Sequence, residues 1–479
     1  MPTRAAMASP RPSWRRVCTV AVVAALAGSS SAAFADMPSP RPSIPGKESA
    51  LLSLPHEAYE LENGLTVILH EDHRQPLVVV NVNVDVGSGD EPPRRTGFAH
   101  LFEHLMFMGT SRVPEKMFDV WMEAEGGWNN AWTSSDRTDY YDVGPSHILP
   151  LLLWMEADRL AVLGDEINQA KLDTQRGVVR NERRQQTEDQ PYGKADLRLS
   201  ELLFPVGHPY HHPTIGSHED LEAATVADVQ GFFRQWYVPR NMSLVIAGDF
   251  QPEPTKALVE KYFGPLKDRP VPPRAAIATP ARLEAEVRET LEDTVSFPKI
   301  VMSWLSPKLY AEGDAELDLL GEILSNGKTS RLYKRLVYEE RVAQSVSAYQ
   351  GSRKRRSQFD IEIVVKPGTD LARVEAMVDE ELARLRDEPI DPAELLRAKN
   401  QYEAGFIMRL QSLATRASLL NTYASSLGRP DGVAEDLQRY LDATPAALAA
   451  AARTVFDPNA RVVMHVVPKK EGAEAAAAQ

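Results

Sequence analysis

The chain has 479 residues, of which 43% are hydrophobic and 25% are charged, and its formal net charge is −13. This length is too great for one hydrophobic core, so two or three domains are expected, with the composition of a folded protein. The negative charge argues against a phosphate-binding surface over the whole molecule, so we expect no nucleic acid partner. The local basic run SRKRRS, around Arg353–Arg356, is interpreted as a solvated loop between two strands, with contact to a partner protein as the alternative.

The N-terminal segment has the pattern of a signal peptide. Arg15 and Arg16 precede the apolar run VCTVAVVAALAG, and the small-x-small sequence Ala33-Phe34-Ala35 follows it as a cleavage site. No later stretch reaches the ~18–20 apolar residues that span a bilayer. We therefore expect a periplasmic or secreted protein with cleavage near Ala35 and no membrane span. The general secretory and twin-arginine export routes both remain open.

Segments rich in proline divide the rest of the chain. One of them precedes the first long run of alternating and periodic apolar residues, and another separates two halves of comparable size. The predicted organisation is a signal peptide at 1–35, an extended leader at 36–50, a zinc-bearing domain at 51–268, a linker at 269–282, a metal-free repeat domain at 283–469 and a disordered tail at 470–479.

The two halves have the sequence pattern of an internal repeat. In the first half, Thr225 precedes a helical segment and Pro239 precedes an apolar strand; Thr444 and Pro458 take these places in the second half, at the same spacing. Each threonine is predicted to be the N-cap of its helix. The sequence therefore predicts an α+β fold of two homologous domains of the same topology. Each would be a mostly antiparallel sheet packed with helices, and a proline-rich linker would join them.

In the first half, an expected strand leads into an expected helix. Valine occupies every second position from Val80 to Val86, which predicts a strand with one face exposed to solvent. A turn rich in glycine and proline follows, and then the segment GFAHLFEHLMFMGT at residues 97–110. Its apolar residues have helical spacing, which predicts a helix with one buried face.

This predicted helix carries two histidines and a glutamate with metal-site spacing. His100 and His104 lie one turn apart, with Cβ atoms ~6 Å from each other. That arrangement suits two imidazoles that bind one tetrahedral zinc ion at ~2.0–2.1 Å. Glu103 lies near the same face, and the H-x-x-E-H order is the inverted form of the zinc-peptidase motif. A helix that carries the pattern by chance and a purely structural zinc site are the alternatives.

Four segments resemble, in family order, the pitrilysin/insulinase family of inverted-motif zinc peptidases. They are GFAHLFEHLMFMGT, GWNNAWTSSDRTDYYDV, VVRNERRQ and HPYHHPTIG, and the resemblance covers essentially the whole mature chain. It implies one Zn2+ per chain, held by His100, His104 and Glu182. It also implies that Glu103 is the general base for a zinc-activated water. Many family members have a glutamate seven residues before the third ligand, where this chain has Gln175.

The resemblance also assigns a substrate-binding strand. The residues Asn130, Ala131, Trp132 and Thr133 match the family's edge strand, which pairs with extended peptides through main-chain hydrogen bonds. A plain hairpin strand is the alternative. Tyr141 matches a tyrosine near the metal. The histidines at 208, 211, 212 and 218 are predicted to lie in a loop and not to form a second metal site.

The second half contains no zinc motif. Single-chain family members carry in their later half an arginine and a tyrosine seven positions apart that hold substrate, and two-subunit members place this pair on the non-catalytic chain. This chain has Val337 and Gln344 at those positions. The resemblance therefore implies the zinc-bearing subunit of a two-chain, processing-peptidase-like enzyme. Its partner would be a homologous zinc-less subunit with the Arg/Tyr pair, and a homodimer is the alternative. We expect an exported zinc metalloendopeptidase acting on extended or unfolded peptides. The alternative is a non-catalytic peptide-binding or assembly subunit of a peptidase-like complex.

Overall fold

The computed structural model describes residues 52–274, 277 and 282–469. The predicted signal peptide, leader and tail lie outside these residues, as does part of the predicted linker. Among the described residues, no helix is both long and apolar enough to cross a membrane.

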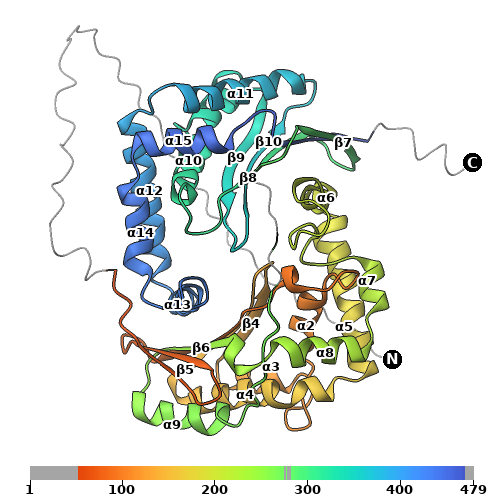
Figure 1. Cartoon of the computed structure of the whole chain (residues 1–479), viewed down its shortest axis with the longest axis vertical. Helices are drawn as coiled ribbons and strands as arrows, with labels where there is room; N and C mark the ends of the chain where they lie inside the picture. Colours follow the sequence, from red (N-terminus) through yellow and green to blue (C-terminus); the bar gives the residue numbers. More distant parts are fainter. Residues whose placement is uncertain (1–51, 275–276, 278–281, 470–479) are drawn as a thin grey trace, which may run out of the picture. The chain divides into compact units, whose positions relative to one another are not determined.

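The strands form two sheets, one with six strands and one with five (Figure 1). The first sheet has the order β1-β2-β6-β3-β5-β4, and its strands are β1 (Glu57–Glu60), β2 (Thr66–Glu71), β3 (Leu77–Val84), β4 (Trp128–Thr133), β5 (Thr138–Pro145) and β6 (Met242–Gly248). The second sheet has the order β7-β11-β8-β10-β9, and its strands are β7 (Val287–Asp293), β8 (Lys299–Ser306), β9 (Ala343–Gly351), β10 (Ser357–Val365) and β11 (Val462–Pro468).

Helices pack on both sheets. The helices of the first half of the chain are α2 (Phe98–Leu105), α3 (Met117–Ala124), α4 (Leu149–Glu166), α5 (Gln169–Glu182), α6 (Gly193–Leu203), α7 (His218–Ala223), α8 (Val226–Trp236) and α9 (Pro252–Phe263). The later helices are α10 (Asp314–Ser325), α11 (Leu371–Asp387), α12 (Pro392–Arg409), α13 (Leu413–Leu427), α14 (Val433–Asp442) and α15 (Pro445–Val455). Short 3-10 segments lie at Ser88–Asp90, Ser146–Ile148 and Pro239–Asn241, and π-helical segments lie at Arg183–Glu188 and Tyr333–Glu339.

The strand order confirms the predicted repeat. The order β2-β6-β3-β5-β4 in the first sheet is equivalent to β7-β11-β8-β10-β9 in the second. In each sheet one pair is parallel, β2 with β6 and β7 with β11, and the other pairs are antiparallel. The α+β fold of two similar, mostly antiparallel sheets packed with helices is therefore the one that the sequence predicts.

Both predicted N-caps are also confirmed. The Thr225 hydroxyl accepts a hydrogen bond from the backbone N–H of Asp228 at 3.2 Å, at the start of α8. The Thr444 hydroxyl accepts from the backbone N–H of Ala447 at 3.1 Å, at the start of α15. Each bond satisfies a donor that the first helical turn cannot pair internally. The same device therefore begins the equivalent helix in each half.

The prediction of a solvent-exposed face on the third strand is wrong. β3 is buried on both sides, and its polar residues Asn81 and Asn83 are each 1% exposed. Helix α13 comes from the second half of the sequence and packs on β3 and β6 of the first sheet. The alternation of valine and asparagine along β3 therefore separates an apolar face from a buried polar face.

A hydrogen-bonded asparagine pair joins α13 to that polar face. The Asn421 amide donates to the Asn81 side-chain oxygen at 2.7 Å and to its backbone carbonyl at 3.1 Å. Its own side-chain oxygen accepts from the Ser243 hydroxyl at 2.6 Å. Asn421 and Asn81 are both buried, so both side chains lose access to water when α13 is in place.

The Asn421→Ala substitution should lower the free energy of unfolding by about 2–4 kcal/mol, because it leaves a cavity and buried polar groups without partners. Urea denaturation followed by circular dichroism measures this difference. Asn400→Ala is the matched control, because Asn400 is an exposed position of α12. An Asn421→Ala chain as stable as the control would show that the pair does not hold α13 on the sheet.

The buried carboxyl of Asp139 should make the stability of the fold depend on pH. Burial raises the pKa of this carboxyl to about 6, although Arg137 and the hydrogen bond from Asn81 favour its charged form. The same carboxyl titrates near ~3.9 in an unfolded chain. The folded protein thus binds the proton more tightly, so the stability that this group contributes falls as the pH rises from about 4 to about 6.

The Asp139→Asn variant should therefore gain about 2–3 kcal/mol in the free energy of unfolding near neutral pH and much less near the acidic end of that window. Its side-chain oxygen can still accept from Asn81. Urea denaturation of both chains across this pH range measures the difference, with the exposed Asp387→Asn as control. Parallel pH profiles for the variant and the wild-type chain would contradict the expectation.

Candidate metal centre

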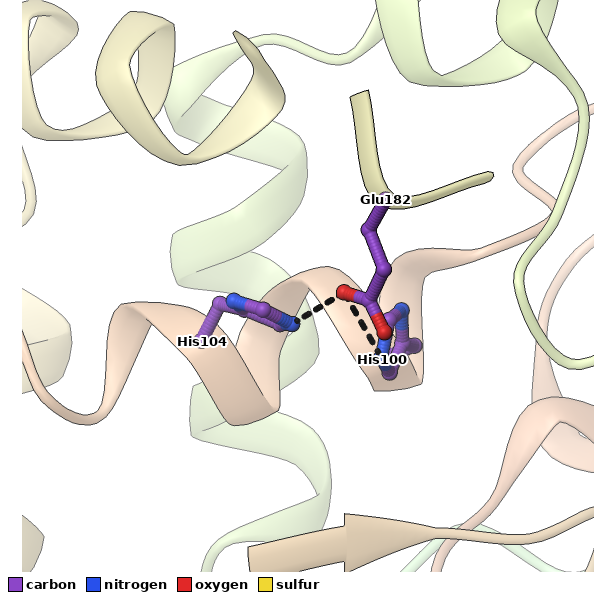
Figure 2. Close-up of side chains that lie close together, drawn as sticks. All are labelled: His100, His104 and Glu182. Atoms are coloured by element: carbon purple, nitrogen blue, oxygen red, sulfur yellow. Dashed lines mark ion pairs between the residues drawn. The ribbon is translucent and has the colours of Figure 1, made fainter. Parts of the chain in front are cut away.

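Helix α2 presents one face to the core and the other to α5. Phe102 is fully buried, and its ring packs against those of Phe233 and Tyr237, with centroids 5.3 and 4.5 Å away. With this apolar face fixed, the helical period directs His100 and His104 toward α5. Helix α5 ends at Glu182, whose side chain points back at the two imidazoles (Figure 2).

The structure brings the three predicted ligands together. The Glu182 Oε2 atom lies 3.1 Å from His104 Nε2 and 3.8 Å from His100 Nε2. The imidazole ring centroids are 4.8 Å apart, with an angle of 81° between the rings. Two ligand atoms on one tetrahedral zinc ion are ~3.3 Å apart, so the three side chains are close to the arrangement that a zinc ion needs.

The chemistry of this donor set also fits zinc. Two imidazoles and one carboxylate are a set found in catalytic zinc sites, which keep a fourth position open. In the described part of the chain, these residues are the only group of three or more possible ligands within such distances. His100, His104 and Glu182 could therefore hold one ion.

The charge states of the metal-free site favour binding of a cation. Burial lowers the pKa of His100 to about 4, and the nearby charge of His104 acts in the same direction. The hydrogen bond with His104 lowers the pKa of Glu182. His100 is therefore a neutral imidazole and Glu182 an ionised carboxylate at neutral pH, which are the forms that bind metals.

Glu103 lies beside this cluster and is held by a neighbouring strand. Its carboxylate accepts a hydrogen bond from the Thr133 hydroxyl at the end of β4. Burial raises the pKa of Glu103, which is 9% exposed, and the bond from Thr133 opposes this rise. A carboxylate with a raised pKa is suited to accept and return a proton near neutral pH. The sequence did not show the Thr133–Glu103 contact, because it joins a strand and a helix that are 30 residues apart.

The strand that carries Thr133 is at the edge of the first sheet. Within the described chain, β4 pairs with β5 and with no other strand. Its side chains alternate, with Thr133 and Ala131 on the side of Glu103 and with Asn130 and Trp132 on the opposite side. The edge position that the sequence predicts for residues 130–133 is present, and its outer main-chain groups face no strand of the described residues.

Tyr141 lies on the neighbouring strand β5, opposite Asn130. Its ring meets that of Trp128 edge-on at 5.6 Å. These contacts place Tyr141 against the edge strand. A role near the metal stays a prediction.

The other predicted positions lie outside the cluster. Gln175 is two turns before Glu182 on α5, and its amide contacts the Met108 sulfur at 2.7 Å. Val337 lies in the π-helical segment and Gln344 in β9, both in the second half. The four further histidines belong to the turn-rich segment at 206–217 and to the first residue of α7, as the loop interpretation predicts except at His218.

Two family models match the chain. Residues 66–203 match the model described as "Insulinase (Peptidase family M16)", and this segment contains the three residues of the cluster and the neighbouring Glu103. Residues 223–402 match the model described as "Peptidase M16 inactive domain". Together the two matches cover most of the described chain.

Relatives and solved structures agree with these matches. The zinc protease PqqE of Helicobacter pylori is 29% identical over 374 residues, which cover 77% of this chain and 83% of that protein. A Schizosaccharomyces pombe protein named "Probable mitochondrial-processing peptidase subunit beta" is 26% identical over 395 residues, which cover 78% of this chain and 82% of that protein. The crystal structure of a protease from Helicobacter pylori has a TM-score of 0.81 at 26% identity and covers 87% of this chain and 100% of that chain. The chain therefore belongs to the M16 family of peptidases, the insulinase and pitrilysin family.

Proposed function

We propose that this chain is an exported zinc metalloendopeptidase that hydrolyses extended or unfolded peptides. The observation that carries the proposal is the convergence of His100, His104 and Glu182, with the buried carboxylate of Glu103 beside them. A purely structural zinc site would have no use for a general base next to an open coordination position. The named activity of the H. pylori relative, a zinc protease, supports the same assignment.

Each of these residues would have its own role in catalysis. The two histidines and Glu182 would hold one zinc ion, which when bound polarises water and the scissile carbonyl. Glu103 would take the proton of the attacking water and return it to the leaving amine. The hydroxyl of Thr133 would keep the carboxylate of Glu103 oriented during both transfers.

The edge strand would align the peptide. An extended substrate that pairs with the outer edge of β4 would gain main-chain hydrogen bonds along residues 130–133, in a way that tolerates many sequences. Asn130, Ala131, Trp132 and Thr133 would then provide the contacts that hold it. Because Thr133 also contacts Glu103, pairing would deliver a peptide bond close to the proposed base.

We further propose that the chain is the catalytic subunit of a heterodimer. Val337 and Gln344 stand where family members have the Arg/Tyr pair, and neither side chain can replace it. A homologous zinc-less subunit would supply the pair, as the word "subunit" in the name of the S. pombe relative suggests by analogy; a homodimer is the alternative. The zinc-bearing domain would be residues 51–268 and the metal-free domain residues 283–469.

Export to the periplasm or beyond is part of the same proposal. It rests on the signal-peptide pattern that ends near Ala35. A solved structure with the same fold is described as the periplasmic protease PqqL from Escherichia coli, with a TM-score of 0.71 at 18% identity. Cell fractionation with an antibody to the mature chain tests the location.

Cleavage of a quenched fluorescent peptide library tests the activity and the partner together. The mature chain would be measured alone and with a co-expressed zinc-less homologue. We expect weak or absent cleavage alone and strong cleavage with the partner. Strong cleavage by the lone chain would remove the need for a partner, whereas peptide binding without cleavage in either sample would favour the non-catalytic alternative.

A further inference from the structure

The N-terminus of the metal-binding helix lacks a side-chain cap. Its N-cap residue is Gly97, which has a φ of +86° and no side chain to accept a hydrogen bond. A Cβ atom at this position would lie only 2.8 Å from the Ile215 carbonyl oxygen and 3.0 Å from the Gly216 Cα atom. The usual capping residues Ser, Thr, Asp and Asn are therefore excluded here by packing and by backbone conformation.

A carboxylate from the preceding loop takes the place of this cap. Glu91 Oε2 accepts a hydrogen bond from the Gly97 N–H at 2.9 Å, and Glu91 Oε1 accepts from the Ala99 N–H at 2.7 Å. The Glu91 side chain is fully buried. Burial raises the pKa of the Glu91 carboxyl, while the hydrogen bonds from Ala99 and Gly97 favour its charged form. These two bonds pair donors that the start of the helix would otherwise leave without acceptors.

The loop that carries Glu91 is itself fixed from several sides. The N–H of Ser88 donates to the Ser134 carbonyl at 3.0 Å, and the N–H of Gly89 donates to the Ser135 carbonyl at 2.8 Å. Serines 134 and 135 directly follow the edge strand. Glu91 is therefore positioned by the same turn that ends β4, next to the Thr133–Glu103 contact.

Arginines from later in the sequence also hold this loop. Arg355 donates to the Gly89 carbonyl at 2.8 Å and pairs with Asp90, and Arg274 donates to Asp90 at 2.9 Å. The basic run at 353–356 does connect β9 and β10, but it is half-buried against these partners. Its interpretation as a solvated loop is therefore wrong. The net effect is a loop with little freedom to move away from α2.

The first turn of α2 positions His100, the histidine that lies farther from Glu182. His100 follows Ala99 directly, and its Nε2 atom is 3.8 Å from Glu182, against 3.1 Å for His104 one turn later. If the first turn frayed, His100 would lose its direction before His104 did, because fraying starts at helix ends. Glu103 lies in the second turn and would be affected less.

We propose that Glu91 is a positioning residue of the metal centre: by capping α2 in place of the side chain that Gly97 lacks, it fixes the turn from which His100 projects and so sets the affinity for zinc. This inference rests on the proposed zinc site but not on peptidase activity. It assigns to Glu91 no contact with metal or substrate.

Glu91→Gln tests the proposal, because the amide can accept from one of the two N–H groups and would turn a donor toward the other. Zinc affinity is measured by competition with a chromophoric chelator, and ligand geometry by the absorption spectrum of the Co2+-substituted chain. We expect about tenfold weaker zinc binding or more, as for other groups that orient metal ligands, with an altered Co2+ spectrum. The matched control is Glu123→Gln, an exposed carboxylate on α3, which should bind zinc as the wild type does.

A purely structural role would give a different pattern. It would lower the unfolding midpoints of the zinc-free and zinc-loaded chains equally and leave the dissociation constant unchanged. If Glu91→Gln does not fold, Glu91→Asp is measured in its place. Aspartate keeps the carboxylate on a side chain that is one methylene shorter, so we expect weaker zinc binding there too. A folded variant with a dissociation constant within about twofold of the wild type would overturn the proposal. A wild-type chain that binds zinc but cleaves no peptide, even with the partner subunit present, would refute the proposed activity and leave this inference standing.

Discussion

Replacement of Glu103 by glutamine should lower kcat for peptide cleavage by about 10²–10⁴-fold, the usual contribution of a general acid–base group. An amide cannot take the proton from the attacking water. Its oxygen can still accept the hydrogen bond from Thr133, so the side chain should keep its place between α2 and β4. Steady-state cleavage of a fluorescent peptide, with zinc content measured on the same sample, checks both parts of the expectation.

The effect on kcat has to be separated from loss of the metal. Glu103→Gln should retain one zinc ion per chain, since the ligands are His100, His104 and Glu182. Glu123→Gln provides the control for a charge change at an exposed site of the same half. A Glu103→Gln enzyme that keeps its full kcat would show that the proton is taken by another group.

Replacement of Glu182 by glutamine should have the largest effect on zinc binding. Outer-shell changes cost ~10–100-fold in metal affinity, and loss of a charged ligand should exceed that range. The carboxylate is also the group on which both imidazoles converge, at 3.1 and 3.8 Å (Figure 2). Zinc retained after dialysis against a chelator measures the loss.

Thermal unfolding gives a second measurement of the same change. A ligand that binds only the folded chain raises its unfolding temperature, so added zinc should stabilise the wild type and have little effect on Glu182→Gln. Glu219→Gln, an exposed carboxylate on α7, is the matched control. Equal zinc-dependent stabilisation of the wild type and Glu182→Gln would remove Glu182 from the ligand set.

The sequence contains the local features of this fold. The valine alternation of β3 and the helical spacing around His100 arise from periods of two and 3.6 residues, which a sequence displays directly. The N-cap threonines at 225 and 444 are local as well, because each hydroxyl pairs with a backbone N–H three residues later. The H-x-x-E-H spacing likewise depends on one turn of one helix. These features predicted the repeat and the two histidine ligands.

The remaining features depend on contacts between distant residues. Asn81 has a polar, surface-like pattern, yet Asn421 buries it from a helix 340 residues away. The Thr133–Glu103 bond and the Glu91 cap join a strand or a loop to a helix, and neither follows a helical or strand period. Glu182 was assigned through the family resemblance, because no local spacing connects it with His104.

Zinc titration of the metal-free chain, with peptide cleavage followed at each addition, measures whether cleavage depends on one bound zinc ion. The sample would contain the partner subunit if the lone chain is inactive. Cleavage should rise with zinc and reach a plateau at one ion per chain, and Glu103→Gln should bind the same ion with strongly reduced cleavage. Full cleavage in the absence of zinc, or one bound zinc without cleavage in every sample, would contradict this expectation.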